Sequence, residues 1–165
     1  MKLLNIEQIS TGFIEVPGKI SLNIYVQGCK KNCPNCQNPS QQSFDTKKII
    51  NADDLTSILS IYPLCDTVCW LGGDAVYQPE AFILFNKEFK KKGLKICLYT
   101  GMKIEEIKGL LDDVDIVIDG EWTGIPVTQE GTNQRIFMKD QDGEWKQIPD
   151  WKTFELILNF SKTVI

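Results

Sequence analysis

Apolar and polar positions alternate along the chain in blocks that predict strands and helices in turn. Short apolar runs rich in β-branched residues are typical of buried strands, and apolar residues repeating every three or four positions are typical of helices. Asn51 is a suitable N-cap for one helix, and Pro79 is a suitable first residue for another, which Gly93 would end. The predicted strands cover residues 21–27, 67–71, 94–99, 114–118 and 135–138. The predicted helices cover about 53–62, 79–92, 104–111 and a segment within 150–162.

Strands and helices alternate from about residue 20 to 119, which is the pattern of βα units around a mostly parallel sheet. The chain has 165 residues, whereas a complete eight-unit barrel takes ~250. We therefore expect an α/β fold, a partial and open-sided (β/α) barrel, in a single domain. Residues 1–19 would form a lead-in with a short strand pair or an extended path, 20–140 the barrel core, and 150–162 a C-terminal helix. Residues 37–50 are expected to be an irregular loop.

Composition narrows the class of protein. The net charge is −4, whereas a nucleic-acid-binding protein typically carries an excess of basic residues. The composition therefore does not indicate a nucleic-acid partner. No apolar run approaches the ~20 residues that span a bilayer, and the first residues lack the apolar region of a signal peptide. We therefore expect a cytoplasmic protein without a membrane partner. In a reducing compartment the six cysteines are expected to be ligands or core thiols rather than disulfides.

Three of the cysteines stand in a C-x3-C-x2-C spacing, as Cys29, Cys33 and Cys36. They follow a predicted strand, and Pro34 and Asn35 bend the chain between the second and third thiols. Thiolates bind zinc, copper(I) and iron–sulfur clusters. A four-coordinate zinc would need a fourth ligand. In a chain without histidine that ligand would come from Cys65, Cys69 or Cys97. A [4Fe–4S] cluster held by three cysteines would instead leave one iron open.

Polar or flexible residues follow four of the predicted strands directly. They are Cys29, Gly72, Thr100 and Asp119. Since ligands of α/β folds bind at the carboxyl ends of parallel strands, we expect these positions to converge at one end of the sheet. Gly72 and Gly73 would allow the backbone to approach a ligand closely. An ordinary βα turn at the glycines, and helix capping at Thr100, remain alternatives.

The cysteine spacing after a first strand resembles that of the radical S-adenosylmethionine (SAM) enzymes. The segment Leu71–Asp74 is similar to their glycine-rich segment. Segments Asp115–Gly120 and Gly131–Ile136, with Pro34 and Asn38 beside the third cysteine, resemble one branch. This branch is the activating proteins of the anaerobic ribonucleoside-triphosphate reductase. The resemblance extends from about Glu15 to Ile136.

The resemblance implies an enzyme, an oxidoreductase with two cofactors. Cys29, Cys33 and Cys36 would hold a [4Fe–4S] cluster whose open iron chelates SAM. Reduction of SAM would release a 5′-deoxyadenosyl radical, which would generate a glycyl radical on the partner reductase. The electron would come from a low-potential donor such as flavodoxin. No catalytic acid or base is required, because the cofactors perform the chemistry.

The resemblance also assigns residues to cofactor binding. Gly72 and Gly73 would hold the methionine amino group, with Asp74 in the place of an acid. Asn35 or Gln37 would contact adenine, although Asn35 is as well explained as a turn residue. Thr100 and Asp119 would lie near the ribose or a cation. The full set is Asn35, Gln37, Gly72, Gly73, Asp74, Thr100 and Asp119.

The sequence departs from the family pattern at several places, including Asn35 and Gln37, neither of which is aromatic. Ala75 replaces a common proline, Glu121 stands where related activases often have lysine, and Glu15 replaces the aspartate of a D-G-P-G-x-R lead-in. Two alternative functions therefore stay open. One is a different radical SAM enzyme, acting on another glycyl-radical protein or a small molecule. The other is a zinc-binding interaction module, although Cys65, Cys69 and Cys97 are expected to be buried core thiols.

Overall fold

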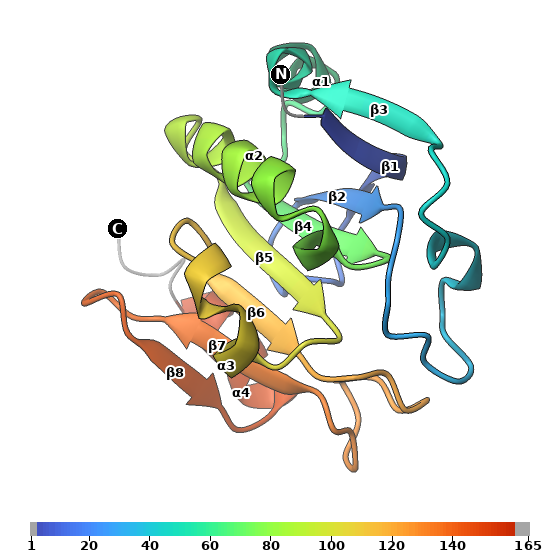
Figure 1. The fold of residues 1–165 in the computed structure, drawn as a ribbon. Helices are drawn as coiled ribbons and strands as arrows, with labels where there is room; N and C mark the ends of the chain where they lie inside the picture. Colours follow the sequence, from blue (N-terminus) through green and yellow to red (C-terminus); the bar gives the residue numbers. More distant parts are fainter. Residues whose placement is uncertain (1–2, 161–165) are drawn as a thin grey trace.

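The computed structural model describes residues 3–160 and arranges them around one eight-stranded sheet (Figure 1). The strands are β1 (Leu3–Gly12), β2 (Ser21–Val26), β3 (Lys48–Asn51), β4 (Thr67–Gly72), β5 (Lys95–Thr100), β6 (Ile116–Asp119), β7 (Arg135–Lys139) and β8 (Trp145–Ile148). Their order across the sheet is β3-β1-β2-β4-β5-β6-β7-β8. The two end strands, β3 and β8, each have one neighbour, so the sheet is open.

The centre of the sheet is parallel and its flanks are antiparallel. Strands β2, β4, β5 and β6 pair in parallel, as the βα pattern predicted. On one side β1 and β3 are antiparallel, and on the other side β7 and β8 are. The predicted α/β, open-sided fold is confirmed. The parallel arrangement is limited to the four central strands, because hairpin-like returns add strands at both edges.

Helices lie on both faces of the sheet. They are α1 (Leu55–Ile61), α2 (Pro79–Lys91), α3 (Ile104–Ile107) and α4 (Trp151–Phe160), with single 3-10 turns η1 (Pro39–Gln41), η2 (Ala52–Asp54), η3 (Ala75–Tyr77) and η4 (Lys108–Leu110). In Figure 1, α2 and α3 lie in front of the sheet and α4 lies behind it. The Asn51 side chain accepts from the Asp53 N–H and caps η2, which confirms the predicted helix start.

Each face of the sheet has its own apolar core. On the α2 side, the Trp70 ring packs against Phe82 and Phe89, and its Nε1–H donates to Asn86 Oδ1 at 2.7 Å. On the other face Cys69 and Cys97, which are opposite each other in β4 and β5, pack in one cluster with Phe154. Burying an aromatic or aliphatic side chain of this size stabilises a fold by roughly 1.5–3 kcal/mol. The second core therefore holds α4 against the sheet.

Several elements differ from the sequence prediction. The lead-in contains one long strand, β1, because its residues pair with β2 on one side and β3 on the other. The loop predicted over 37–50 contains the turn η1 and ends where β3 begins, and neither β3 nor β8 was predicted. Cys69 and Cys97 are buried as expected, while Cys65 is partly exposed. Residues 1–2 of the lead-in and 161–162 of the predicted C-terminal segment lie outside the described residues.

Within residues 3–160, none of the helices has the length and apolar character needed to cross a membrane.

Candidate functional site

The carboxyl ends of the parallel strands meet at one pocket of about 130 Å³. Residues that follow β2, β4, β5 and β6 all line it, as the positions of the predicted site residues required. The predicted residues in its lining are Cys29, Cys33, Cys36, Gln37, Gly72, Gly73, Asp74 and Thr100. Asn35 and Asp119 do not line it, although Gly120, directly after Asp119, does.

Backbone hydrogen bonds fix the base of the cysteine loop. The Gly28 N–H donates to the Gln41 carbonyl at 2.8 Å, and the Cys29 N–H donates to the Gln42 carbonyl at 3.1 Å. The Gln27 side chain, which is 1% exposed, donates to the Ser43 carbonyl at 2.7 Å. These bonds tie the start of the cysteine loop to the end of η1 and to the two residues after it. Sequence reasoning missed Gln27 and Gln41, since their role depends on this long-range pairing.

Two asparagines inside the loop have left-handed backbone conformations. Asn32 has φ 53° and Asn35 has φ 55°, a region that asparagine tolerates better than most residues. The Asn35 carbonyl also accepts from Trp122 Nε1 at 2.9 Å. Asn35 is therefore a turn residue that ties the loop to the segment after β6, as the alternative interpretation held. Trp122, which lines the pocket, was not predicted.

The local environment sets the protonation of the thiols. Burial raises the pKa of Cys29 above its ordinary value, and the Lys31 N–H, 3.4 Å from the sulfur, partly offsets this. Burial likewise raises the pKa of Cys33, opposed by the Trp122 backbone N–H. Metal ligands must be thiolates, and a bound cation is what stabilises a thiolate against such a raised pKa.

The spacing of the thiols distinguishes the kinds of metal centre. Four sulfurs around one zinc stand about 3.8 Å apart, given a Zn–S bond of about 2.3 Å and tetrahedral angles. Within residues 3–160 no three Cys, Asp or Glu side chains gather closely enough to hold a metal ion. Three thiols that line one pocket can instead each bind a different iron of one cluster.

The remaining cysteines do not complete the site. Neither Cys65, Cys69 nor Cys97 lines the pocket. Cys69 and Cys97 are fully buried between the sheet and α4. A fourth protein thiolate for a closed zinc site is therefore absent from the pocket within the described residues, and the donor set fits a three-cysteine cluster with an open iron.

Gly72 and Gly73 pack directly against the cysteine loop. A Cβ on Gly73 would lie 2.5 Å from the Gly28 carbonyl oxygen and 2.7 Å from that of Gln41. Gly72 has φ 94°, which favours glycine. The Gly73 N–H donates to the Val26 carbonyl at 2.8 Å. The two glycines thus join β4 to the loop after β2, and both also face the pocket.

Asp74 connects the ends of β4 and β5. Its carboxylate is 1% exposed and accepts from Thr100 Oγ1 at 2.8 Å, the Gly101 N–H at 2.9 Å and the Val76 N–H at 3.3 Å. Burial raises its pKa to about 6, against the lowering effect of these donors. Thr100 Oγ1 also accepts from the Met102 N–H, which is a turn-forming contact. Asp74 and Thr100 therefore shape the wall of the pocket.

Asp119 bonds to neighbouring groups of the protein itself. Its side chain is fully buried, and its two oxygens accept from Arg135 and from the Ile104 N–H, the latter at 2.7 Å. Arg135 also pairs with Glu105, which lowers the pKa of Glu105 to about 2. Asp119 therefore anchors α3 and β7 beside the pocket, and its predicted contact with the ribose or a cation stays a prediction.

A second cavity, of about 520 Å³, adjoins the cysteine pocket. The two share Lys31, Gly101 and Gly120. Ligand sites typically measure 300–1,000 Å³, so the small pocket and its neighbour together offer room for a nucleoside-sized cofactor. Lys31 and Lys103 add cationic groups that the sequence interpretation did not use.

Known proteins resemble this chain in both sequence and fold. The family model described as 4Fe-4S single cluster domain matches residues 16–136. Pyruvate formate-lyase-activating enzyme of Clostridium pasteurianum is 29% identical over 115 residues, which cover 66% of this chain and 48% of that enzyme. The chain thus spans about half the length of this curated relative. The crystal structure of QueE from Escherichia coli matches with a TM-score of 0.54 and 15% identity over 61% of this chain and 54% of that one, a likeness of fold.

Proposed function

Because the chain belongs to the 4Fe-4S single cluster domain family, we propose that it is a radical SAM enzyme that activates a glycyl-radical protein. The observation that supports this most is the pocket itself. It brings together Cys29, Cys33 and Cys36 with the Gly72–Gly73 backbone, and no further cysteine of the described chain lines it. The matched family and the relatives imply a [4Fe–4S] cluster and SAM as the cofactors.

When bound, the two cofactors supply reductive cleavage of SAM and a carbon radical that abstracts hydrogen. The chain supplies binding and orientation. The three thiolates would hold three irons, and the Gly72 and Gly73 carbonyls can accept from the methionine ammonium. The Asp74–Thr100 hydrogen bond keeps the β4 and β5 ends together, so the pocket wall is formed before the cofactor binds. The bond from Trp122 to the Asn35 carbonyl holds the cysteine loop over the pocket.

We further propose the anaerobic ribonucleoside-triphosphate reductase as the activated protein. The segment Gly131–Ile136, on which that resemblance rests, supplies Gln134 to the cysteine pocket and Asn133 and Arg135 to the adjoining cavity. The relative from Clostridium pasteurianum is named as an activating enzyme for pyruvate formate-lyase, which supports activation of a protein in general. A low-potential donor such as flavodoxin would supply the electron.

The test combines two measurements on anaerobically reconstituted protein. With dithionite and SAM, we expect 5′-deoxyadenosine by liquid chromatography. With the reductase added, we expect the doublet EPR signal of a glycyl radical. Release of 5′-deoxyadenosine without that doublet would reject the reductase and keep the radical SAM activity. A protein that binds iron and SAM but releases no 5′-deoxyadenosine would contradict both.

A radical SAM enzyme acting on another glycyl-radical protein or on a small molecule is the second candidate. The relative from Clostridium pasteurianum keeps it open, because that enzyme is named for pyruvate formate-lyase and not for the reductase. A panel of glycyl-radical proteins in the same EPR assay separates the alternatives. Only the cognate protein should acquire the doublet, whereas a small-molecule enzyme would leave every protein in the panel without it.

A further inference from the structure

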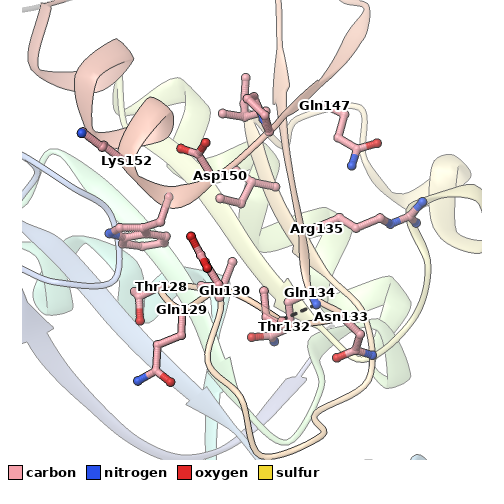
Figure 2. Close-up of a pocket in the computed structure, with 16 residues that line it drawn as sticks. Thr128, Gln129, Glu130, Thr132, Asn133, Gln134, Arg135, Gln147, Asp150 and Lys152 are labelled. Atoms are coloured by element: carbon pink, nitrogen blue, oxygen red, sulfur yellow. Dashed lines mark hydrogen bonds between the residues drawn. The ribbon is translucent and has the colours of Figure 1, made fainter.

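A third cavity, of about 600 Å³, lies beside the cysteine pocket, and none of the three cysteines lines it. Its walls are the segment 127–136, the end of β8 and the first turn of α4 (Figure 2). Gln134 lines both this cavity and the cysteine pocket. A group bound in the cavity would therefore share a wall, Gln134, with the pocket proposed to hold the cofactors.

The lining of the cavity suits part of a polypeptide. Ile148, Pro149 and Trp151 contribute apolar surface, and the amides of Gln129 and Gln147 can each donate and accept hydrogen bonds. The cavity lies at the end of β8, which pairs only with β7 within the described sheet. An extended segment can add to such an edge through its main chain and place one side chain into a neighbouring pocket.

The charges that face the cavity are negative. The Arg135 guanidinium is bound to Asp119 and Glu105, and Figure 2 shows Arg135 and Lys152 pointing away from the centre of the cavity. The carboxylates of Glu130 and Asp150 lie toward its middle in the same view. Asp150 accepts from the Thr153 N–H, while the Glu130 carboxylate has no hydrogen-bond or ion-pair partner within residues 3–160.

We propose that this cavity binds an extended segment of the protein substrate that carries an arginine or lysine, and that Glu130 pairs with that basic side chain. This inference rests on the proposed function, because it places the segment of the substrate protein beside the cofactor pocket. The apolar surface of Trp151 would contact the aliphatic stem of the basic residue, and the neighbouring amides would bind its main chain.

The test is an NMR titration of the 15N-labelled, reconstituted protein with three synthetic peptides. They are acetyl-Ala-Ala-X-Ala-Ala-amide with X as arginine, glutamine or glutamate. The Trp151 indole N–H, assigned from the spectrum of Trp151→Phe, and the Gln147 side-chain amide report occupancy of the cavity. We expect the arginine peptide to shift both signals and to bind about three- to five-fold more tightly than the glutamine peptide, as one exposed ion pair allows.

Substitutions separate the pair with Glu130 from general attraction. Glu130→Gln should remove the preference for the arginine peptide, and Glu130→Lys should transfer it to the glutamate peptide. The control Glu144→Gln makes the same charge change at the opposite end of β8 and should keep the preference. Equal binding of the three peptides, or an undiminished preference in Glu130→Gln, would overturn the proposal.

Arginine amide, titrated alone, identifies the kind of ligand. If it binds as tightly as the arginine peptide, the cavity takes a small cation and the polypeptide part of the proposal is wrong. Weaker binding by arginine amide supports it. These outcomes do not depend on SAM cleavage. A protein that prefers the arginine peptide but releases no 5′-deoxyadenosine would contradict the proposed function and leave the binding site standing.

Discussion

Replacing Asp119 by asparagine tests whether this residue is a scaffold or a cofactor ligand. The Asp119 side chain is fully buried. It accepts from Arg135 Nε at 2.9 Å and from the Ile104 N–H at 2.7 Å. Asparagine keeps the volume but loses the charge, and it turns an amide N–H group toward Arg135 or Ile104. The substitution therefore breaks a buried pair while leaving the structure around it intact.

The expected cost follows from the burial of the two partners. Removing one member of a buried ion pair costs about 3–5 kcal/mol. Arg135 is 31% exposed and keeps its contact with Glu105, so we expect a smaller loss of about 2–3 kcal/mol in the free energy of unfolding. For a chain of this length that corresponds to a fall in Tm of about 4–12 °C. Urea and thermal unfolding followed by circular dichroism measure both quantities.

Glu105→Gln is the matched control, because it removes the other carboxylate that pairs with Arg135. The Glu105 side chain is 55% exposed, so water already screens it and its loss should change Tm far less than Asp119→Asn. The reasoning would be refuted if the two variants unfolded alike while Asp119→Asn alone weakened SAM binding. That result would instead favour the direct contact between Asp119 and the cofactor that was predicted from the sequence.

Three further predictions concern the pocket. Cys33→Ser should prevent formation of a SAM-binding cluster and abolish release of 5′-deoxyadenosine, while Cys65→Ser, outside the pocket, should retain both by iron analysis and chromatography. Gly73→Ala should lower the free energy of unfolding by about 1–3 kcal/mol in urea titrations, since its Cβ meets the Gly28 oxygen at 2.5 Å. The control Gly109→Ala has open space around its new Cβ, so it should not lower the free energy of unfolding by a comparable amount. Asp74 has a folded-state pKa raised from 3.8 to about 6, so the folded form binds a proton more tightly than the unfolded form. Wild-type stability relative to Asp74→Asn should therefore fall as the pH rises from 4 to 7, by roughly 2 kcal/mol, and a flat difference across that range would contradict the assignment.

The sequence predicted the features that depend on local spacing. The cysteine triplet and the glycine pair each follow a strand, and parallel strands place their carboxyl ends together, so their convergence at one pocket was predictable. The turn at Asn35, predicted as an alternative to a contact with adenine, was predictable because asparagine tolerates the left-handed backbone conformation. The helices at Asn51 and Pro79 were predictable for the same local reasons.

The features that depend on distant partners were not predictable. The role of Asp119 is set by Arg135, which lies across the β6–β7 pairing, and nothing in the local sequence around Asp119 shows it. Trp122 reaches the cysteine loop only because the fold brings two separate segments together. The strand β3 was missed because its pairing with β1 requires long-range register, which a polar stretch of sequence does not reveal.

The central claim is that three cysteines of this chain hold a cluster with one iron open to SAM. The most direct measurement is EPR of the anaerobically reconstituted and reduced protein, recorded with and without SAM. The account predicts a [4Fe–4S]⁺ signal whose g values change when SAM is added. A colourless protein that retains zinc, or a cluster signal unchanged by SAM, would contradict it.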